Sequence, residues 1–361
     1  MTDSMTNDKK IVLSGIRATG NLHLGNYFGA LNKFVRMQDD YDCRFFIADL
    51  HALTTHPDPK MLHDNVKNIL AEYLAAGLDP EKNILYVQSD VPEISEMYLL
   101  MNMHAGIGEL MRTASFKDKA RKALGISVKP DEDEGEIEKE ICGNQSNKSV
   151  NAGLLTYPTL MAVDILIHKA DFVPVGKDQE QHLELTRRFA RRFNSFYGVD
   201  LFPEPENFNF GDHAVKVPGL DGSGKMGKSE GNCIYLIDDE KTLRKKVMRA
   251  VTDEGPKEPN SPVSQPVQNL FDLMELTSTP DTLQHFKDAY ADCSIRYGDL
   301  KKQLAEDILK ITLPIRERIM EVRNDDALMG RVLKEGAEKA RANAVKTLSE
   351  VREIMGIHKF Y

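Results

Sequence analysis

The strongest constraint on the fold lies in the first 35 residues, where an apolar run is followed by a glycine-rich turn and a helical pattern. Residues 11–13 are apolar, and large apolar residues recur at helical spacing from Tyr27 to Val35. The stretch between them, 15–26, holds three glycines. Glycine lets a ligand approach the backbone closely, and a helix N-terminus offers free N–H groups to phosphate. This pattern predicts a strand, a phosphate-binding turn and a helix.

A second segment, Lys225-Met226-Gly227-Lys228-Ser229, places two lysines three residues apart around a glycine. Such a cationic loop suits the binding of a polyphosphate leaving group. His23 and Asn26, at the start of the first helix, would add neutral hydrogen-bond donors that stabilise charge developing on phosphorus. Together the two segments predict attack on the α-phosphate of ATP.

These two segments resemble the signatures of the class I aminoacyl-tRNA synthetases, which are written HIGH and KMSKS. The chain has His23-Leu24-Gly25-Asn26 and a KMGKS loop in which Gly227 stands for the serine. The asparagine variant, with its flanking 14–16 and 27–30, is similar to the bacterial-type tryptophanyl-tRNA synthetase branch. The resemblance extends from Ile11 to Met355.

Further along the chain, apolar strand patterns alternate with helical ones. Residues 44–48, 84–88 and 215–220 are predicted strands, 62–74 is a predicted helix that ends near Gly77, and 93–122 has a helical pattern. This alternation predicts a parallel sheet with ligands at the carboxyl ends of its strands. His51 follows a strand at such an end, where it is either a substrate contact or a satisfied structural residue.

The predicted fold class is α/β: a Rossmann-like parallel-sheet nucleotide-binding domain with a helical insertion, followed by an α-helical C-terminal domain. We expect the catalytic domain at 1–220, with its connecting insertion at about 93–150, the KMGKS region at 221–235 and the helical domain at 236–361. Within the insertion, 125–148 is rich in acidic residues and is predicted to be a surface loop without an assigned function.

The apolar stretch 151–166 contains one carboxylate, Asp164. An acid on an apolar helix needs a hydrogen-bond donor, because its desolvation is costly. That donor is either a backbone or arginine group, or the indole N–H of a bound tryptophan, which has one donor and no acceptor. Met161, Val173 and Val175 could pack around the indole ring.

The resemblance implies roles for the remaining candidate residues. Those expected to act on the triphosphate are His23, Asn26, Lys117, Lys225 and Lys228. Those expected to bind ATP are Arg17, Ala18, Thr19, Gly25, Asn26, Gly176, Lys177, Asp178, Val217, Lys225, Met226, Gly227, Lys228 and Ser229. Those expected to bind tryptophan are Leu13, His51, Met161, Asp164, Val173, Val175 and Gln179. Asp178 could equally be an N-cap of the next helix.

Composition limits the possible partners. A net charge of −9 argues against indiscriminate nucleic-acid binding, and neither a signal peptide nor a membrane-spanning run is predicted. Four cysteines without a C-x-x-C pair indicate no structural zinc or iron–sulfur cluster. We therefore expect a cytoplasmic protein that binds neither membranes nor DNA.

The resemblance implies a tryptophan–tRNA ligase that uses ATP, with Mg²⁺ bound through its phosphates, to form tryptophanyl-adenylate and then charges tRNA(Trp). It also implies a homodimer. Two alternatives stay open: tyrosine specificity on the same scaffold, and a non-catalytic regulatory paralogue. Ala162 stands where tyrosine-specific relatives usually carry glutamine, which favours the larger substrate.

Overall fold

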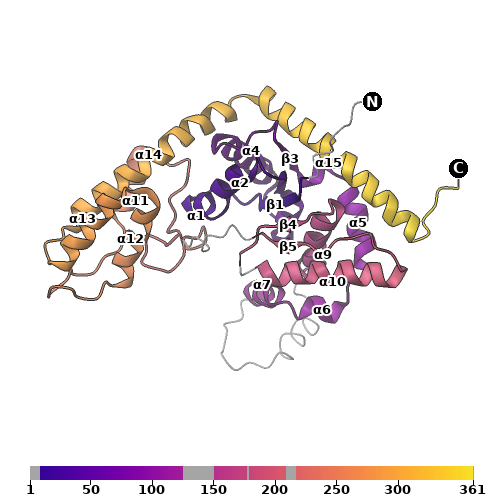
Figure 1. The fold of residues 1–361 in the computed structure, drawn as a ribbon, viewed down its shortest axis with the longest axis horizontal. Coiled ribbons are helices and arrows are strands. Elements are labelled where there is room, and N and C mark those ends of the chain that lie inside the picture. Colours follow the sequence, from indigo (N-terminus) through magenta and orange to yellow (C-terminus); the bar gives the residue numbers. More distant parts are fainter. Residues whose placement is uncertain (1–8, 125–149, 177–178, 209–216, 361) are drawn as a thin grey trace.

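The computed structural model describes residues 9–124, 150–176, 179–208 and 217–360, and its centre is a parallel sheet. The strand order is β3-β2-β1-β4-β5 (Figure 1). The strands are β1 Ile11–Arg17, β2 Asp42–Ala48, β3 Asn83–Val87, β4 Phe172–Val173 and β5 Glu206–Asn207. All pairings in this sheet are parallel, and β1 in the middle pairs with both β2 and β4. The predicted α/β fold is confirmed.

Successive side chains along the strands point to opposite faces of the sheet, and each face carries a hydrophobic core. Val12, Phe45 and Leu85 point into the core that includes α2 (Asn32–Met37) and α4 (Pro59–Ala75). Leu13, Phe46 and Tyr86 point into the core on the other face. This alternation is the period of two expected of strands buried on both faces.

The helices of the first half surround this sheet. The first helical segment comprises α1 Leu24–Asn26, a π-helical turn Tyr27–Leu31 and α2. The predicted second helix is α4, and Gly77 follows it with φ +108°, a conformation that favours glycine. Three further helices are α3 Asp49–Ala52, α9 Ala152–Ile167 and α10 Glu180–Tyr197.

Two predicted elements differ from the structure. The helical pattern at 93–122 is divided into α5 Glu93–Asn102, α6 Ile107–Met111 and α7 Ala114–Leu124, because Gly106 and Thr113 lie in the connecting turns. The strand expected at 215–220 is absent from its described part, Val217 to Leu220, where the backbone is irregular. The acidic stretch 125–148 lies outside the described residues.

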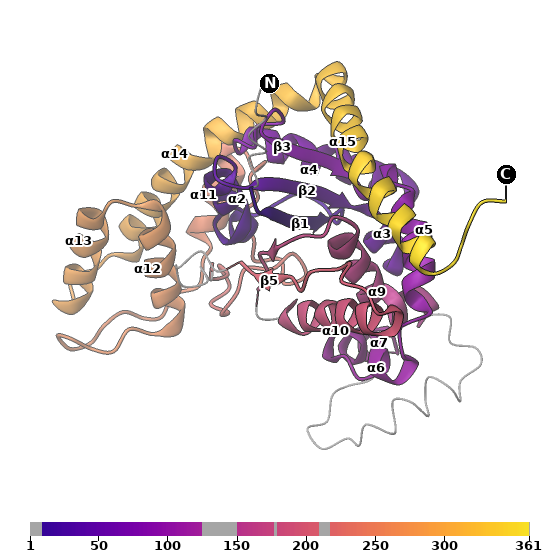
Figure 2. The ribbon, with the colours of Figure 1, turned by 45° about the vertical axis from the view of Figure 1, so that its right-hand side comes forward.

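The second half of the chain is helical. Its helices are α11 Glu240–Met248, α12 Gln265–Thr277, α13 Pro280–Ala291, α14 Tyr297–Arg323 and α15 Asp326–Ile354. Helices α11 to α13 gather at one end of the molecule, α14 leads back along α4, and α15 crosses the catalytic unit beside β3 and α5 (Figure 2). No helix in the described ranges has the length and apolar character needed to cross a bilayer.

Gly336 lets α15 lie against the backbone of β3. A Cβ atom at this position would come 1.8 Å from the carbonyl oxygen of Leu85. Polar contacts fasten the same helix to the catalytic unit: Arg341 pairs with Glu93 at 2.7 Å and Lys169 with Glu350 at 2.6 Å. The last long helix is thus part of the covering of the catalytic sheet.

Candidate active site

Asp164 is the centre of a buried hydrogen-bonded group at the carboxyl ends of two strands. It lies on α9 with 1% of its surface exposed. Its Oδ2 is 2.9 Å from Nε2 of His51, which follows β2. Gln88, which follows β3, donates from Nε2 to Oδ1 at 2.7 Å and to Oδ2 at 2.9 Å. The partners of Asp164 within the protein are thus a histidine and a glutamine, and not the backbone or arginine group that was one of the two alternatives.

The charge of Asp164 depends on these two partners. Burial raises the pKa of Asp164, and the hydrogen bonds from His51 and Gln88 oppose that shift. A carboxylate held in this way keeps hydrogen-bond acceptor capacity, because each of its oxygens has two lone-pair sites. Asp164 can therefore accept a further donor from a ligand.

A cavity of about 360 Å³ opens beside this group. It is lined by all seven residues predicted to bind tryptophan, namely Leu13, His51, Met161, Asp164, Val173, Val175 and Gln179. Gly15 and Phe46 form part of its wall, and a Cβ atom on Gly15 would lie 2.5 Å from the Phe46 ring. This volume lies within the range of ligand pockets, and an apolar lining with one acid suits a flat ring with one donor.

Two cations stand on the polar side of the cavity. Arg17 donates to the His51 carbonyl at 3.3 Å, and the Lys119 Nζ lies 3.6 Å from the centre of the Tyr157 ring. Burial, together with the charge of Arg17, lowers the pKa of Lys119 to about 8. Both side chains line the cavity, so an anionic group of the ligand would meet two positive charges there.

The lysine of α7 that lines the cavity is Lys119, whereas the sequence analysis named Lys117. Two residues along a helix correspond to a rotation of about 200°, so the two side chains leave α7 on opposite sides. Phe116 and Ala120 are buried against α9 and fix the orientation of this helix. Lys117 is not among the residues that line the cavity.

The first signature segment forms the start of α1. His23 N donates to Oδ1 of Asn26 at 3.1 Å, which leaves the Asn26 amide N–H groups for a ligand. Burial and the nearby Lys228 and Lys225 lower the pKa of His23 to about 4, so its ring is neutral at pH 7. Within the described residues, its buried Nδ1 has no hydrogen-bond partner. Gly25 is required here, because a Cβ atom would lie 2.8 Å from the His23 ring.

The KMGKS loop is adjacent to this turn. Lys228 donates from Nζ to the Gly20 carbonyl at 2.9 Å and lies 3.4 Å from that of Thr19. Met226 is buried in the core, while Lys225 is exposed. Ser229 donates to the carboxylate of Glu230 at 2.9 Å. The fold thus brings together two segments that are two hundred residues apart in the sequence.

Asn232 holds the loop and was not identified from the sequence. Its Oδ1 accepts from Gly227 N at 2.9 Å, and its Nδ2 donates to Asp221 at 2.9 Å and to the Lys225 carbonyl at 3.1 Å. This buried amide fixes the backbone on both sides of Met226. The residue lies just after the lysine motif, but its type alone did not mark it as an anchor.

The other residues predicted to bind ATP lie at several different places around the site. Gly176 lines the cavity, Ala18 is buried at the end of β1, and Val217 is buried where its carbonyl accepts from Met226 N at 2.8 Å. Lys177 and Asp178 lie outside the described residues. In the described parts of the chain, no group of three or more His, Cys, Asp or Glu side chains is arranged to hold a metal ion.

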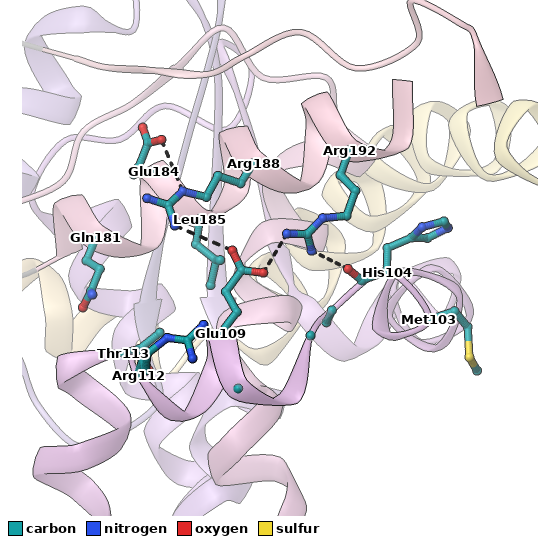
Figure 3. A pocket seen from close by; sticks show the side chains of 13 residues that line it. Met103, His104, Glu109, Arg112, Thr113, Gln181, Glu184, Leu185, Arg188 and Arg192 are labelled. Atoms are coloured by element: carbon teal, nitrogen blue, oxygen red, sulfur yellow. Dashed lines mark hydrogen bonds and ion pairs between the residues drawn. The ribbon is translucent and has the colours of Figure 1, made fainter. Parts of the chain in front are cut away.

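A larger hollow of about 830 Å³ lies between α6 and α10, away from these residues (Figure 3). Glu109 in it pairs with Arg192 at 2.8 Å and lies 3.7 Å from Arg188. Among the described residues that line it, the two acids Glu109 and Glu184 are both paired with arginines, and there is no signature residue. The smaller cavity at Asp164 is therefore the better candidate for catalysis.

Comparisons with known proteins place the chain in a family. Residues 5–312 match the family model described as tRNA synthetases class I (W and Y). A tryptophan–tRNA ligase of Porphyromonas gingivalis is 61% identical over 96% of this chain and 98% of its own length. A tryptophan–tRNA ligase of Fusobacterium nucleatum is 40% identical over 96% of this chain and 97% of its own.

A solved structure agrees. The tryptophanyl-tRNA synthetase of Campylobacter jejuni, in complex with ADP and tryptophan, superposes with a TM-score of 0.80 at 32% identity. The match covers 96% of this chain and 99% of that one.

Proposed function

The chain belongs to the class I tRNA synthetases of the tryptophan and tyrosine family and acts as a tryptophan–tRNA ligase, and we propose that the Asp164 cavity and the two signature segments carry out its adenylation step. In that step the carboxylate of tryptophan attacks the α-phosphorus of ATP. The P–O bond to pyrophosphate breaks, and tryptophanyl-adenylate and pyrophosphate form. The acyl group then passes to the terminal ribose of tRNA(Trp).

The observation that carries this proposal is Asp164, the one acid among the described residues that line the cavity, beside the apolar side chains that would pack on an indole ring. Asp164 accepts the indole N–H, while His51 and Gln88 keep its carboxylate oriented. Met161, Val173 and Val175 surround the ring. A tyrosine would bring a hydroxyl to the same place, so discrimination rests on hydrogen bonding and on the depth of the cavity.

Rate enhancement in this scheme comes from positioning and electrostatics. Because the substrate carboxylate is the nucleophile, no covalent intermediate with the enzyme is needed. Arg17 and Lys119, on the polar side of the cavity, orient the tryptophan carboxylate and the α-phosphate. The role predicted for Lys117 is assigned to Lys119 on this ground.

The triphosphate lies along the start of α1 and beneath the KMGKS loop. His23, neutral at pH 7, and the amide of Asn26 donate to phosphate oxygens, and Lys225 and Lys228 neutralise the pyrophosphate as it leaves. Gly176, Lys177, Asp178 and Val217 are proposed to hold the ribose and adenine. Mg²⁺ would arrive with ATP, since it is usually held through substrate phosphates and water, and would supply further positive charge.

The homodimer implied by the family has a suitable surface. Leu99, Met103 and Ile107, on and between α5 and α6, are exposed, as is Phe196 on α10 at 72%. His104 lies between them, with its ring 5.6 Å from that of Phe196. We propose that this patch contacts a second copy of the chain; a monomeric Phe196→Ser variant beside a dimeric parent in sedimentation analysis would support it. A cytoplasmic location stays a prediction.

The test of the function is amino-acid-dependent exchange of labelled pyrophosphate into ATP, with each of the twenty amino acids. We expect exchange with tryptophan alone. Exchange with tyrosine would overturn the proposed use of the cavity, and absence of exchange with every amino acid would favour the regulatory alternative. Charging of purified tRNA(Trp) then tests the second step.

A further inference from the structure

Glu72 is a buried acid outside the cavity that the proposed mechanism does not use. It lies in the buried stretch of α4 between Ala71 and Tyr73, and 1% of its surface is exposed. Glutamate is almost never fully buried unless it is paired, because the desolvation of its charge is costly. We therefore expect hydrogen-bond donors or a cation close to the carboxyl group of Glu72.

The carboxyl group of Glu72 accepts a hydrogen bond from the backbone of the first signature turn. Both of its oxygens lie 3.0 Å from the backbone N of Leu22, which donates to them. Leu22 directly precedes His23, and its carbonyl accepts from Leu236 N at 3.0 Å. Leu22 is thus the point at which the turn, the helix α4 and the segment after the KMGKS loop meet.

Lys228 approaches the same turn from the other direction. Its Nζ is hydrogen-bonded to the carbonyls of Thr19 and Gly20, which lie three and two residues before Leu22, whose N–H donates to Glu72. The titratable groups that act on Lys228 are Glu72 and Cys233, and the anionic form of each raises its pKa against the lowering by burial; the pKa of the Cys233 thiol is itself raised to about 11. The cations that act on Glu72 are Lys228 and Arg323, which comes from the end of α14.

We propose that Glu72 is a positioning residue for adenylation: it fixes, through Leu22, the glycine-rich turn on which Lys228 is seated, and once ionised it favours the ammonium form of Lys228. This inference rests on the role proposed above for Lys228. Glu72 does not touch the reacting atoms. It acts through the lysine that neutralises the leaving pyrophosphate.

The pH range in which Glu72 acts follows from its environment. Burial raises the pKa of Glu72 to about 8, so the carboxyl is protonated at pH 6.5 and ionised at pH 9. Burial lowers the pKa of Lys228 from its usual value, and the negative charge of Glu72 opposes that lowering. An ionised Glu72 then extends the charged form of Lys228 to higher pH.

The variant Glu72→Gln separates charge from structure, because its amide oxygen can still accept from Leu22. We expect pyrophosphate exchange by the wild type and the variant to be equal at pH 6.5. At pH 9 we expect kcat of the variant to be about three- to tenfold lower, from loss of a nearby charge. A merely structural role would change activity at both pH values or at neither.

A second measurement follows the protonation of Lys228 directly and does not depend on enzyme activity. Trace acetylation with acetic anhydride between pH 6 and 10, read by mass spectrometry, gives a reactivity midpoint for each lysine. We expect the Lys228 midpoint of the variant to lie about half a pH unit or more below that of the wild type, with Lys225 unchanged.

The outcomes distinguish the inference about Glu72 from the role proposed for Lys228 in the reaction. A Lys228 midpoint that does not move in Glu72→Gln overturns the inference, and so does a moved midpoint with parallel pH–rate profiles. Exchange that persists in Lys228→Ala would instead overturn the proposed role of Lys228 in the reaction.

Discussion

The amino-acid cavity and the triphosphate side of the site differ in how their polar groups are held. In the cavity, Asp164 receives hydrogen bonds from His51 and Gln88, which come from two different elements. On the triphosphate side, Lys225 is exposed, Lys228 is seated on backbone carbonyls, and the described residues leave Nδ1 of His23 unpartnered. The cavity is preorganised for its ligand, whereas the triphosphate side acquires its full set of contacts when phosphate is bound.

The largest effect should come from disrupting the preorganised side. Asp164→Ala removes the proposed indole acceptor and leaves the donors of His51 and Gln88 unpaired, so we expect kcat/KM for tryptophan to fall on the order of 10³-fold. Pyrophosphate exchange at varied tryptophan concentration measures it. The ATP KM serves as the internal control, and an unchanged tryptophan dependence would refute the assignment of Asp164.

Stability against pH tests the charge balance of the triphosphate side. The pKa of His23 is lowered to about 4 in the folded chain, below its usual value near 6.5. The unfolded chain therefore binds this proton first as the pH falls, and acidification favours unfolding. Between pH 7.5 and pH 5, His23 should cost the wild type about 2 kcal/mol of unfolding free energy.

Urea titrations of wild type and His23→Gln at these two pH values measure that difference. The variant should lose less stability on acidification, because glutamine does not titrate. The buried His168, whose pKa is lowered to about 3, is present in both proteins and cancels. Equal losses in both proteins would contradict the stated environment of His23.

A smaller effect is expected from loosening the KMGKS loop at its anchor. Asn232→Ala removes the acceptor of Gly227 N and the donor to the Lys225 carbonyl. We expect about a tenfold loss in kcat/KM for ATP, the equivalent of one hydrogen bond of about 1.4 kcal/mol, with the tryptophan KM preserved. A loss on the tryptophan side instead would show that the two halves of the site are not separable.

The smallest effect should come from restoring the serine of the family motif. In Gly227→Ser, the new Cβ would lie 2.0 Å from Oε2 of Glu230, the end of a flexible exposed side chain that can rotate away. We expect less than about a threefold change in kcat of exchange, because one surface hydroxyl contributes little. A change above tenfold in either direction would mean that Glu230 has a role in loop closure.

The features of the fold and of the site that depend on local sequence pattern were predicted from the sequence. Strands β1, β2 and β3, the helix of Asp164 and the start of α1 follow from periodicity and from glycine positions, whereas β5 was not predicted. Asp164 itself was found because an acid in an apolar helix is conspicuous. The cavity lining followed from the family resemblance, and all seven predicted residues line it.

Residues that act through tertiary contact were missed. Gln88 follows a strand just as His51 does, so the same rule that selected His51 could have found it. The choice between Lys117 and Lys119 depends on the rotation of α7, which is set by its packing against α9. Glu72 depends on Leu22, 50 residues away in the sequence, and Asn232 depends on the irregular path of its own loop; no periodicity in α4 or in the loop reveals these partners.

The contact of Gly336 with β3 has a consequence for synthesis of the protein on the ribosome. Domains generally fold from the N-terminus as the chain emerges, but here the strand that leads to Gln88 is covered by residues more than two hundred positions later. A nascent chain that has already made every signature residue still displays an uncovered strand β3, and it completes its catalytic sheet only when α15 has left the ribosome.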